Sequence, residues 1–203
     1  MINYKTNSKK ILIVVDYQYD FVSTKGALPV KNAKFMWRNI QKRIDDPSYE
    51  NIIYTFDTHE KEEYFKSEES KTFPNIHCEF GTKGWWLYKI SPRNKEIKRF
   101  YNNRIKPCDI VINDEFFFVK DLFSIWEGNK GFKDFFTNGF DKDTQIDVCG
   151  VAEDVCVSMF VIGLIENGFT NVNVISECVK GINIEETKPN VDKMKSMNNV
   201  TYV

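Results

Sequence analysis

Short apolar segments recur along the chain and alternate with segments of helical periodicity. The apolar segments are rich in β-branched or aromatic residues, which is typical of strands buried on both faces. They are residues 11–15, 51–56, 116–119 and 145–149, continued by 171–175 and 200–203. Strands that alternate with helices predict a parallel sheet with helices on both of its faces, and therefore an α/β fold.

Three segments between these strands have helical patterns. The first has one apolar face, the second is apolar on nearly all sides, and the third is polar. They are the segment with Ala33, Met36, Trp37, Ile40 and Ile44, residues 154–166, and residues 185–197. Residues 59–114 are less regular and contain several prolines and glycines. We interpret them as an insertion with short helices inside a single domain of residues 1–203.

Composition and charge narrow the class of protein. The chain has 203 residues, 42% of them hydrophobic and 15% aromatic, which is enough for a packed core. Its 28 basic and 29 acidic residues nearly cancel to a net charge of −1. This balance favours neither nucleic acid nor an anionic membrane as a partner. No apolar run approaches the ~20 residues of a membrane-spanning helix, and no signal peptide is visible.

The cysteines indicate a reducing compartment. They number five, an odd count, and they are irregularly spaced, so a disulfide framework is not expected. We therefore expect a cytoplasmic protein. Cys149 and Cys178 fit inert packing positions, and Cys108 fits a loop or the surface.

Reactive residue types follow four of the predicted strands. Ligands of open α/β sheets bind beyond the carboxyl ends of the strands. The residues at those ends are Asp16, Asp57 with His59, Lys120, and Cys156 in the first turn of the following helix. A carboxylate, an ammonium, a thiol and a candidate metal site would therefore meet at one edge of the sheet.

Each of these residues also has a simpler interpretation. Asp16 could cap a loop, Lys120 could pair with Asp121 or Asp114 at the surface, and Cys156 could be a small core residue. The position of Cys156 favours a functional role. A thiol near a helix N-terminus and a lysine is expected to have a lowered pKa.

The chain has two histidines, His59 and His77, and both follow the second strand. With Asp57 they form a donor set that suits Zn²⁺, Fe²⁺ or Mn²⁺, with further positions left to water or substrate. The alternative is that both are ordinary polar loop residues.

Four blocks of sequence, spread over most of the chain, carry a family resemblance. They are Val15-Asp16-Tyr17-Gln18-Tyr19-Asp20-Phe21 with Gly26-Ala27-Leu28, Thr55-Phe56-Asp57-Thr58-His59 with His77-Cys78-Glu79-Phe80-Gly81-Thr82-Lys83-Gly84, Val119-Lys120-Asp121-Leu122-Phe123-Ser124, and Cys149-Gly150-Val151-Ala152-Glu153-Asp154-Val155-Cys156-Val157. In this order and together, they resemble nicotinamidases of the isochorismatase-like cysteine hydrolase superfamily.

The resemblance implies a three-layer α/β/α fold with a six-stranded, mostly parallel sheet. It implies a catalytic triad of Asp16, Lys120 and Cys156, and a divalent metal, usually zinc or iron, held by Asp57, His59 and His77. It also implies a cis peptide bond between Val151 and Ala152. The chain departs from some family members because residues 60–70 contain no third histidine. Glu68 or Glu69 could supply a further ligand.

The activity that the resemblance implies is hydrolysis of nicotinamide to nicotinate and ammonia, a step of NAD salvage. Backbone N–H groups of Ala152 and Cys156 would stabilise the oxyanion, and the metal would bind the pyridine nitrogen. Phe21, Phe73 and Trp126 are candidates for contact with the ring. Two alternatives remain: another small-amide or ureido hydrolase, and a metal-binding protein without turnover. The oligomeric state is open, with a homo-oligomer among the options.

Overall fold

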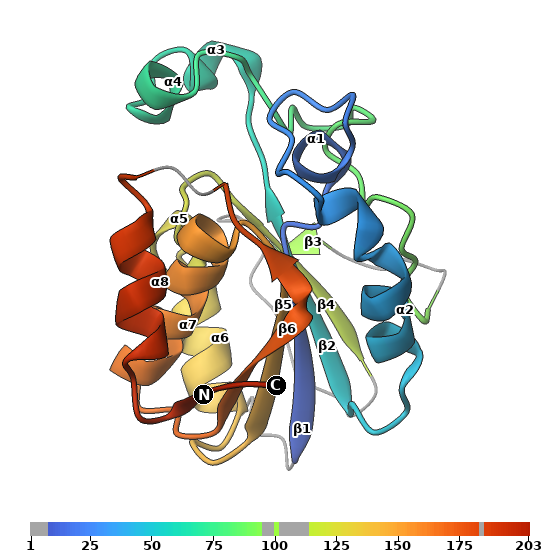
Figure 1. Cartoon of the computed structure of the whole chain (residues 1–203), viewed down its shortest axis with the longest axis vertical. Helices are drawn as coiled ribbons and strands as arrows, with labels where there is room; N and C mark the ends of the chain where they lie inside the picture. The colour runs from blue at the N-terminus through green and yellow to red at the C-terminus, as the bar shows by residue number, and fades with distance from the viewer. Residues whose placement is uncertain (1–7, 95–99, 102–113, 183–184) are drawn as a thin grey trace.

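The structure, a computed structural model, describes residues 8–94, 100–101, 114–182 and 185–203. Its centre is a sheet of strand order β3-β4-β2-β1-β5-β6-β7 in which the strand pairings are parallel (Figure 1). The strands are β1 (Lys10–Val15), β2 (Asn51–Asp57), β3 (Phe100–Tyr101), β4 (Glu115–Lys120), β5 (Gln145–Val151), β6 (Val172–Lys180) and β7 (Val200–Tyr202). The predicted parallel sheet of six strands is confirmed, and the two-residue β3 extends it at one edge.

Helices cover both faces of this sheet, which confirms the predicted three-layer α/β/α architecture. In Figure 1, α2 covers one face, and α5, α6, α7 and α8 lie together on the other. The helices are α1 (Tyr19–Val22), η1 (Ala33–Phe35), α2 (Trp37–Asp45), α3 (Lys61–Tyr64), α4 (Glu69–Thr72), α5 (Ile125–Gly128), α6 (Phe132–Gly139), η2 (Glu153–Val157), α7 (Ser158–Glu166) and α8 (Lys188–Lys195).

The apolar pattern of the chain accounts for the core. All seven residues of β2 are buried, as are the last five of β1, because helices cover both faces of these central strands. On α6, Phe132, Phe135 and Phe136 are fully buried at helical spacing and pack against the sheet, where Phe118 of β4 lies 5.0 Å from Phe132 between ring centroids. Aromatic side chains therefore fill the space between the sheet and the helices beside it.

The helices differ from the sequence prediction in number and at their ends, because α1, α5 and α6 were not predicted. The segment around residues 33–44 divides into the short η1 and then α2, and the predicted helix at 154–166 begins as a π-helix, η2, before α7. In the predicted insertion, α3 and α4 lie beyond the carboxyl ends of the strands (Figure 1). Cys108 falls outside the described residues. In the described part of the chain, no helix is long and apolar enough to cross a membrane.

Candidate active site and metal centre

The carboxyl ends of β1, β2 and β4 bring three charged side chains together. Asp57 and Lys120 are paired in register on neighbouring strands, and Asp16 directly follows Val15, which pairs with both β2 and β5. Gly150 of β5 has a φ of +121°, and a Cβ there would lie 2.0 Å from the Val15 carbonyl oxygen. Glycine therefore lets β5 approach β1 closely just before the turn that carries Cys156.

Asp16 is held in a left-handed conformation, with a φ of +44°. Its backbone N–H donates to the carbonyl oxygen and to Oγ1 of Thr55, each at 3.2 Å, and Thr55 Oγ1 donates to Asp16 Oδ1 at 2.6 Å. Aspartate is one of the few residues that tolerate this backbone region. The contacts fix one carboxylate oxygen on the neighbouring strand and leave Oδ2 facing Lys120.

Lys120 contacts all three of the other reactive groups. Its Nζ lies 3.0 Å from Asp16 Oδ2, 3.0 Å from Asp57 Oδ1 and 3.7 Å from Cys156 Sγ. The surface pairing considered from the sequence is wrong, because the side chain is buried between two carboxylates. Burial alone would lower the pKa of Lys120, but the negative charges of Asp16 and Asp57 outweigh it and hold the pKa well above its usual range.

The ionisation of Cys156 differs from the sequence prediction. Burial raises the pKa of this thiol well above its usual value, the nearby Lys120 charge opposes the shift, and the charges of Asp16 and Asp57 add to it. The expected lowering is wrong, because the loss of solvent outweighs the lysine. Burial also raises the pKa of Asp16, against the effect of Lys120. The site therefore pairs a protonated thiol with a carboxyl group of increased basicity.

Four buried side chains form a cluster that could hold a metal ion. One ligand atom from each of Asp57, His59, Glu69 and His77 lies within 4.8 Å of all the others. Asp57 Oδ2 is 2.9 Å from His59 Nε2 and 3.3 Å from His77 Nε2, and His77 Nε2 is 3.2 Å from Glu69 Oε1. Two imidazoles and two carboxylates are a donor set that suits Zn²⁺, Fe²⁺ or Mn²⁺. The residues present therefore fit a divalent cation.

The structure distinguishes between Glu68 and Glu69, the two glutamates that the sequence offered as a further metal ligand. Glu69 is buried at 8% exposure and faces the histidines. Glu68 points to solvent and pairs with Lys71 at 2.6 Å. Burial lowers the pKa of His77, but hydrogen bonds and charges from Asp57 and Glu69 outweigh it and raise the pKa to about 10. A proton on this ring supplies positive charge that a bound cation would replace.

Two further side chains support the cluster. Gln18 donates to the Asp57 carbonyl oxygen and accepts from the Asp57 N–H, both at 2.8 Å. Tyr64 OH lies 3.3 Å from His77 Nδ1 and also donates to the Phe73 carbonyl oxygen. Outer contacts of this kind orient metal ligands. Neither residue was predicted in this role, although Gln18 lies within one of the motif blocks.

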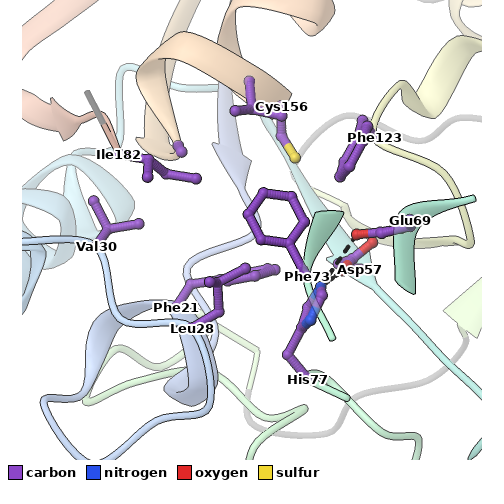
Figure 2. A pocket seen from close by; sticks show the side chains of 12 residues that line it. Phe21, Leu28, Val30, Asp57, Glu69, Phe73, His77, Phe123, Cys156 and Ile182 are labelled. Carbon is purple, nitrogen blue, oxygen red and sulfur yellow. Dashed lines mark hydrogen bonds and ion pairs between the residues drawn. The ribbon is translucent and has the colours of Figure 1, made fainter. Parts of the chain in front are cut away.

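An apolar pocket connects the cluster with the thiol. It holds about 350 Å³ of empty space that is partly open to solvent. Asp57, Glu69 and His77 lie at one end, and Cys156 lines another part (Figure 2). Ala152 also belongs to the lining. Its apolar walls are formed by Phe21, Leu28, Val30, Phe73, Phe123, Val155 and Ile182. Such a pocket can hold a small flat ring between a nucleophile and a metal site.

The predicted pocket residues divide into two groups. Phe21 and Phe73 line the pocket, with ring centroids 5.2 and 6.2 Å from that of His77. Trp126 does not line it. Its indole N–H donates to the Phe160 carbonyl oxygen at 3.1 Å, and its ring packs against Phe132 of α6 and Phe160 of α7. The prediction for Trp126 is wrong, because its apolar surface is used in packing between helices.

Several pocket residues were missed from the sequence. Leu28 and Phe123 lie within the motif blocks, and that position was an available signal for both. Val30 and Ile182 come from loops without a motif, so only the fold brings them to the pocket. The peptide bond between Val151 and Ala152 is cis.

Two other buried cysteines, Cys149 and Cys178, lie away from this pocket. Cys149 is fully buried on β5, and its thiol contacts the Ile13 carbonyl oxygen at 3.3 Å. Cys178 is fully buried on β6. Neither residue lines the pocket, so Cys156 is the thiol that the fold places beside Lys120 and the metal-type cluster.

The fold and this edge of the sheet define a class, the α/β proteins with a buried cysteine, aspartate and lysine beside a metal-type cluster. A protein-family model described as the isochorismatase domain matches residues 10–202. The chain therefore belongs to the isochorismatase family.

Solved structures with the same fold are similar over nearly the whole chain. A pyrazinamidase of Pyrococcus horikoshii in complex with zinc is 24% identical, with a TM-score of 0.71, over 96% of this chain and 98% of that one. The protein PnC1 of L. infantum in complex with nicotinate is 20% identical, with a TM-score of 0.72, over 100% and 96%. An N-carbamoylsarcosine amidase of Thermoplasma acidophilum is 18% identical, with a TM-score of 0.69, over 96% and 95%. A comparison with curated proteins found no match.

Proposed function

We propose that this single-domain protein is a metal-dependent cysteine amidohydrolase that converts nicotinamide to nicotinate and ammonia, a reaction of NAD salvage. The observation that carries the proposal is the position of Lys120, whose Nζ lies 3.7 Å from Cys156 Sγ and 3.0 Å from oxygens of both Asp16 and Asp57. One buried ammonium thus links a nucleophile and its base to a ligand of the candidate metal centre.

The chemistry begins with proton transfer, because the thiol is protonated at rest. Asp16, whose pKa is raised, takes the proton of Cys156, and Lys120 stabilises the thiolate by its charge. The thiolate attacks the carboxamide carbon, and the N–H groups of Ala152 and Cys156 stabilise the oxyanion. Asp16 then protonates the departing ammonia. A water molecule hydrolyses the thioester, releasing nicotinate and restoring the thiol.

Asp57, His59, Glu69 and His77 would hold the metal ion, for which we propose zinc. When bound, the ion supplies a Lewis acid that can coordinate the ring nitrogen of the substrate. Phe21 and Phe73 would hold the ring by contact with its faces or edges, and the apolar walls would exclude bulk water from around the bound ring.

The lining of the pocket favours nicotinamide over a ureido acid such as the N-carbamoyl amino acids. No lysine or arginine lines this pocket in the described part of the chain, so the cluster around His77, which the proposal assigns to the ring nitrogen, is the cationic partner that this lining would offer a substrate carboxylate. A neutral aromatic amide needs only apolar walls and a contact for its ring nitrogen. The four described cysteines are free thiols, which supports a reducing, cytoplasmic location.

Ammonia release from nicotinamide tests the proposal directly. We expect turnover by the metal-loaded wild type and none by Cys156→Ala. N-carbamoylsarcosine serves as the competing substrate. Turnover of that compound but not of nicotinamide would favour the ureido hydrolase, and turnover of neither would favour a metal-binding protein without catalysis.

A further inference from the structure

Asp20 connects two segments that are distant in the sequence and that both reach the site. Its Oδ2 accepts the backbone N–H of Cys78 at 2.9 Å, and its Oδ1 accepts that of Ala27 at 3.2 Å. Cys78 follows the metal-type ligand His77, and Ala27 precedes Leu28 of the pocket wall. One carboxylate therefore holds the loop of the cluster and the loop of the wall at the same time.

The contact with Cys78 extends to the second histidine. The Cys78 carbonyl oxygen accepts the backbone N–H of His59 at 3.1 Å, so hydrogen bonds run from Asp20 through Cys78 to His59. Cys78 has a φ of +48°, a region that cysteine rarely adopts. A fixed acceptor for its N–H stabilises this conformation, which sets the direction in which the neighbouring His77 leaves the backbone.

The main chain of Asp20 strengthens the same connection. Its carbonyl oxygen accepts the N–H of Leu28 at 3.1 Å, and its N–H donates to the Gly84 carbonyl oxygen at 3.0 Å. Two glycines make room for it. A Cβ on Gly84 would lie 2.1 Å from Asp20 Oδ2, and one on Gly26 would lie 2.3 Å from the Asp20 carbonyl oxygen. At both Gly26 and Gly84, the absence of a side chain therefore lets the backbone lie directly against Asp20.

We propose that Asp20 is a positioning residue that sets both the affinity of the cluster for its metal ion and the position of the Leu28 wall against the substrate. The part of this inference that concerns the substrate rests on the proposed function, whereas the part that concerns metal affinity does not. A carboxylate is needed because both partners are N–H donors. The amide of asparagine could accept from only one of them and would present its own NH₂ group to the other.

The test compares Asp20→Asn with Glu79→Gln. Both remove one negative charge near the metal loop, but the Glu79 side chain has no part in the hydrogen bonds described above. Zn²⁺ affinity is measured on the full-length, metal-free protein by competition with a chelator. KM and kcat for nicotinamide are measured at saturating Zn²⁺, so that any change in KM reflects the wall and not the occupancy of the metal site.

We expect Asp20→Asn to weaken Zn²⁺ binding by about 10- to 100-fold, as losses of outer contacts to metal ligands do. At saturating Zn²⁺, KM should rise by a larger factor than kcat falls. Gly84→Ala should reproduce both effects without a change of charge, since its methyl group displaces Oδ2. If circular dichroism shows that Asp20→Asn does not fold, the Gly84→Ala variant takes its place in the comparison.

Zn²⁺ affinity and KM within about twofold of the Glu79→Gln values, in folded Asp20→Asn and Gly84→Ala proteins, would overturn the proposal. The failure of the proposed function has a different signature. In that case the wild type would not hydrolyse nicotinamide, whereas Asp20→Asn would still bind Zn²⁺ more weakly than Glu79→Gln.

Discussion

The ammonium of Lys120 lies 3.0 Å from Asp57 Oδ1, while the other oxygen of Asp57 lies 2.9 Å from the His59 ring. A single carboxylate therefore belongs to the catalytic group of residues through one oxygen and to the metal-type cluster through the other. The register of β2 and β4 places these two residues side by side, so the sheet itself connects the two halves of the site.

Replacing Lys120 should destabilise the protein as well as inactivate it. Lys120→Met leaves Asp16 and Asp57 buried without their shared cation, and loss of one partner of a buried ion pair costs about 3–5 kcal/mol. Chemical denaturation of the wild type and the variant measures this loss. A variant of wild-type stability would show that these carboxylates do not depend on Lys120 for their charge balance.

Cysteine substitutions should separate the nucleophile from packing thiols. Cys156→Ala should abolish turnover while the protein remains folded, because one thiol contributes little volume. Cys149→Ala is the control, since Cys149 is also buried but contacts a main-chain carbonyl on β1. It should stay active if it folds. Ammonia release and circular dichroism check both variants, and wild-type rates in Cys156→Ala would exclude the mechanism.

The adjacent glutamates allow a matched test of the metal centre. Purified protein should contain about one divalent ion per chain, because four ligands form a single cluster. Glu69→Gln and His77→Ala should lower the metal content, whereas Glu68→Gln should not, since Glu68 faces solvent and pairs with Lys71. Elemental analysis after dialysis measures this. Equal occupancy in Glu69→Gln and Glu68→Gln would remove Glu69 from the site.

Substrate choice should depend on the ring nitrogen. Benzamide has nearly the shape of nicotinamide but no lone pair for a metal ion, and a site built around a polar contact rejects such an analogue by ~10⁴-fold in favourable cases. Pyrazinamide retains a nitrogen at the equivalent ring position and should remain a substrate. Values of kcat/KM for the three amides decide the point. Similar values for benzamide and nicotinamide would mean that no ion holds the ring.

Alkaline pH should destabilise the fold through its buried thiols. Burial raises the pKa of Cys178 from 9.0 to about 12. Between these values the unfolded chain binds fewer protons than the folded one, so the free energy of unfolding falls as pH rises, by up to about 1.4 kcal/mol per pH unit for this thiol. Urea denaturation between pH 8 and 11 should show a shallower decrease for Cys178→Ala. Parallel curves would contradict this account.

Much of the fold could be predicted from local pattern. The strands around Ile13 and Ile53 are apolar throughout because both of their faces are covered, and that property is visible without coordinates. The helix α6 was missed, although Phe132, Phe135 and Phe136 repeat at helical spacing. Its signal lies in a short segment between two polar loops, where periodicity over eight residues is easily overlooked.

The residue types at the carboxyl ends of the strands could be predicted from the chain alone, because parallel strands expose those ends at one edge of the sheet. Asp16, Asp57, Lys120 and Cys156 could be identified in this way. The effects of these side chains on one another depend on contacts that form only when the chain folds. The pKa of Cys156 depends on the balance between burial and the charge of Lys120, and the pattern of one segment contains neither quantity.

The same distinction applies to the ligands and the pocket. Glu68 and Glu69 are chemically identical neighbours, and only the rotation of α4 directs Glu69 to the histidines. Trp126 was an equally plausible ring contact until its packing between α5 and α7 was known. Ile182 reaches the wall from a loop that follows β6. Residue identity is local, whereas direction, burial and proximity arise from contacts between segments that are distant in the sequence, and those contacts form only in the folded chain.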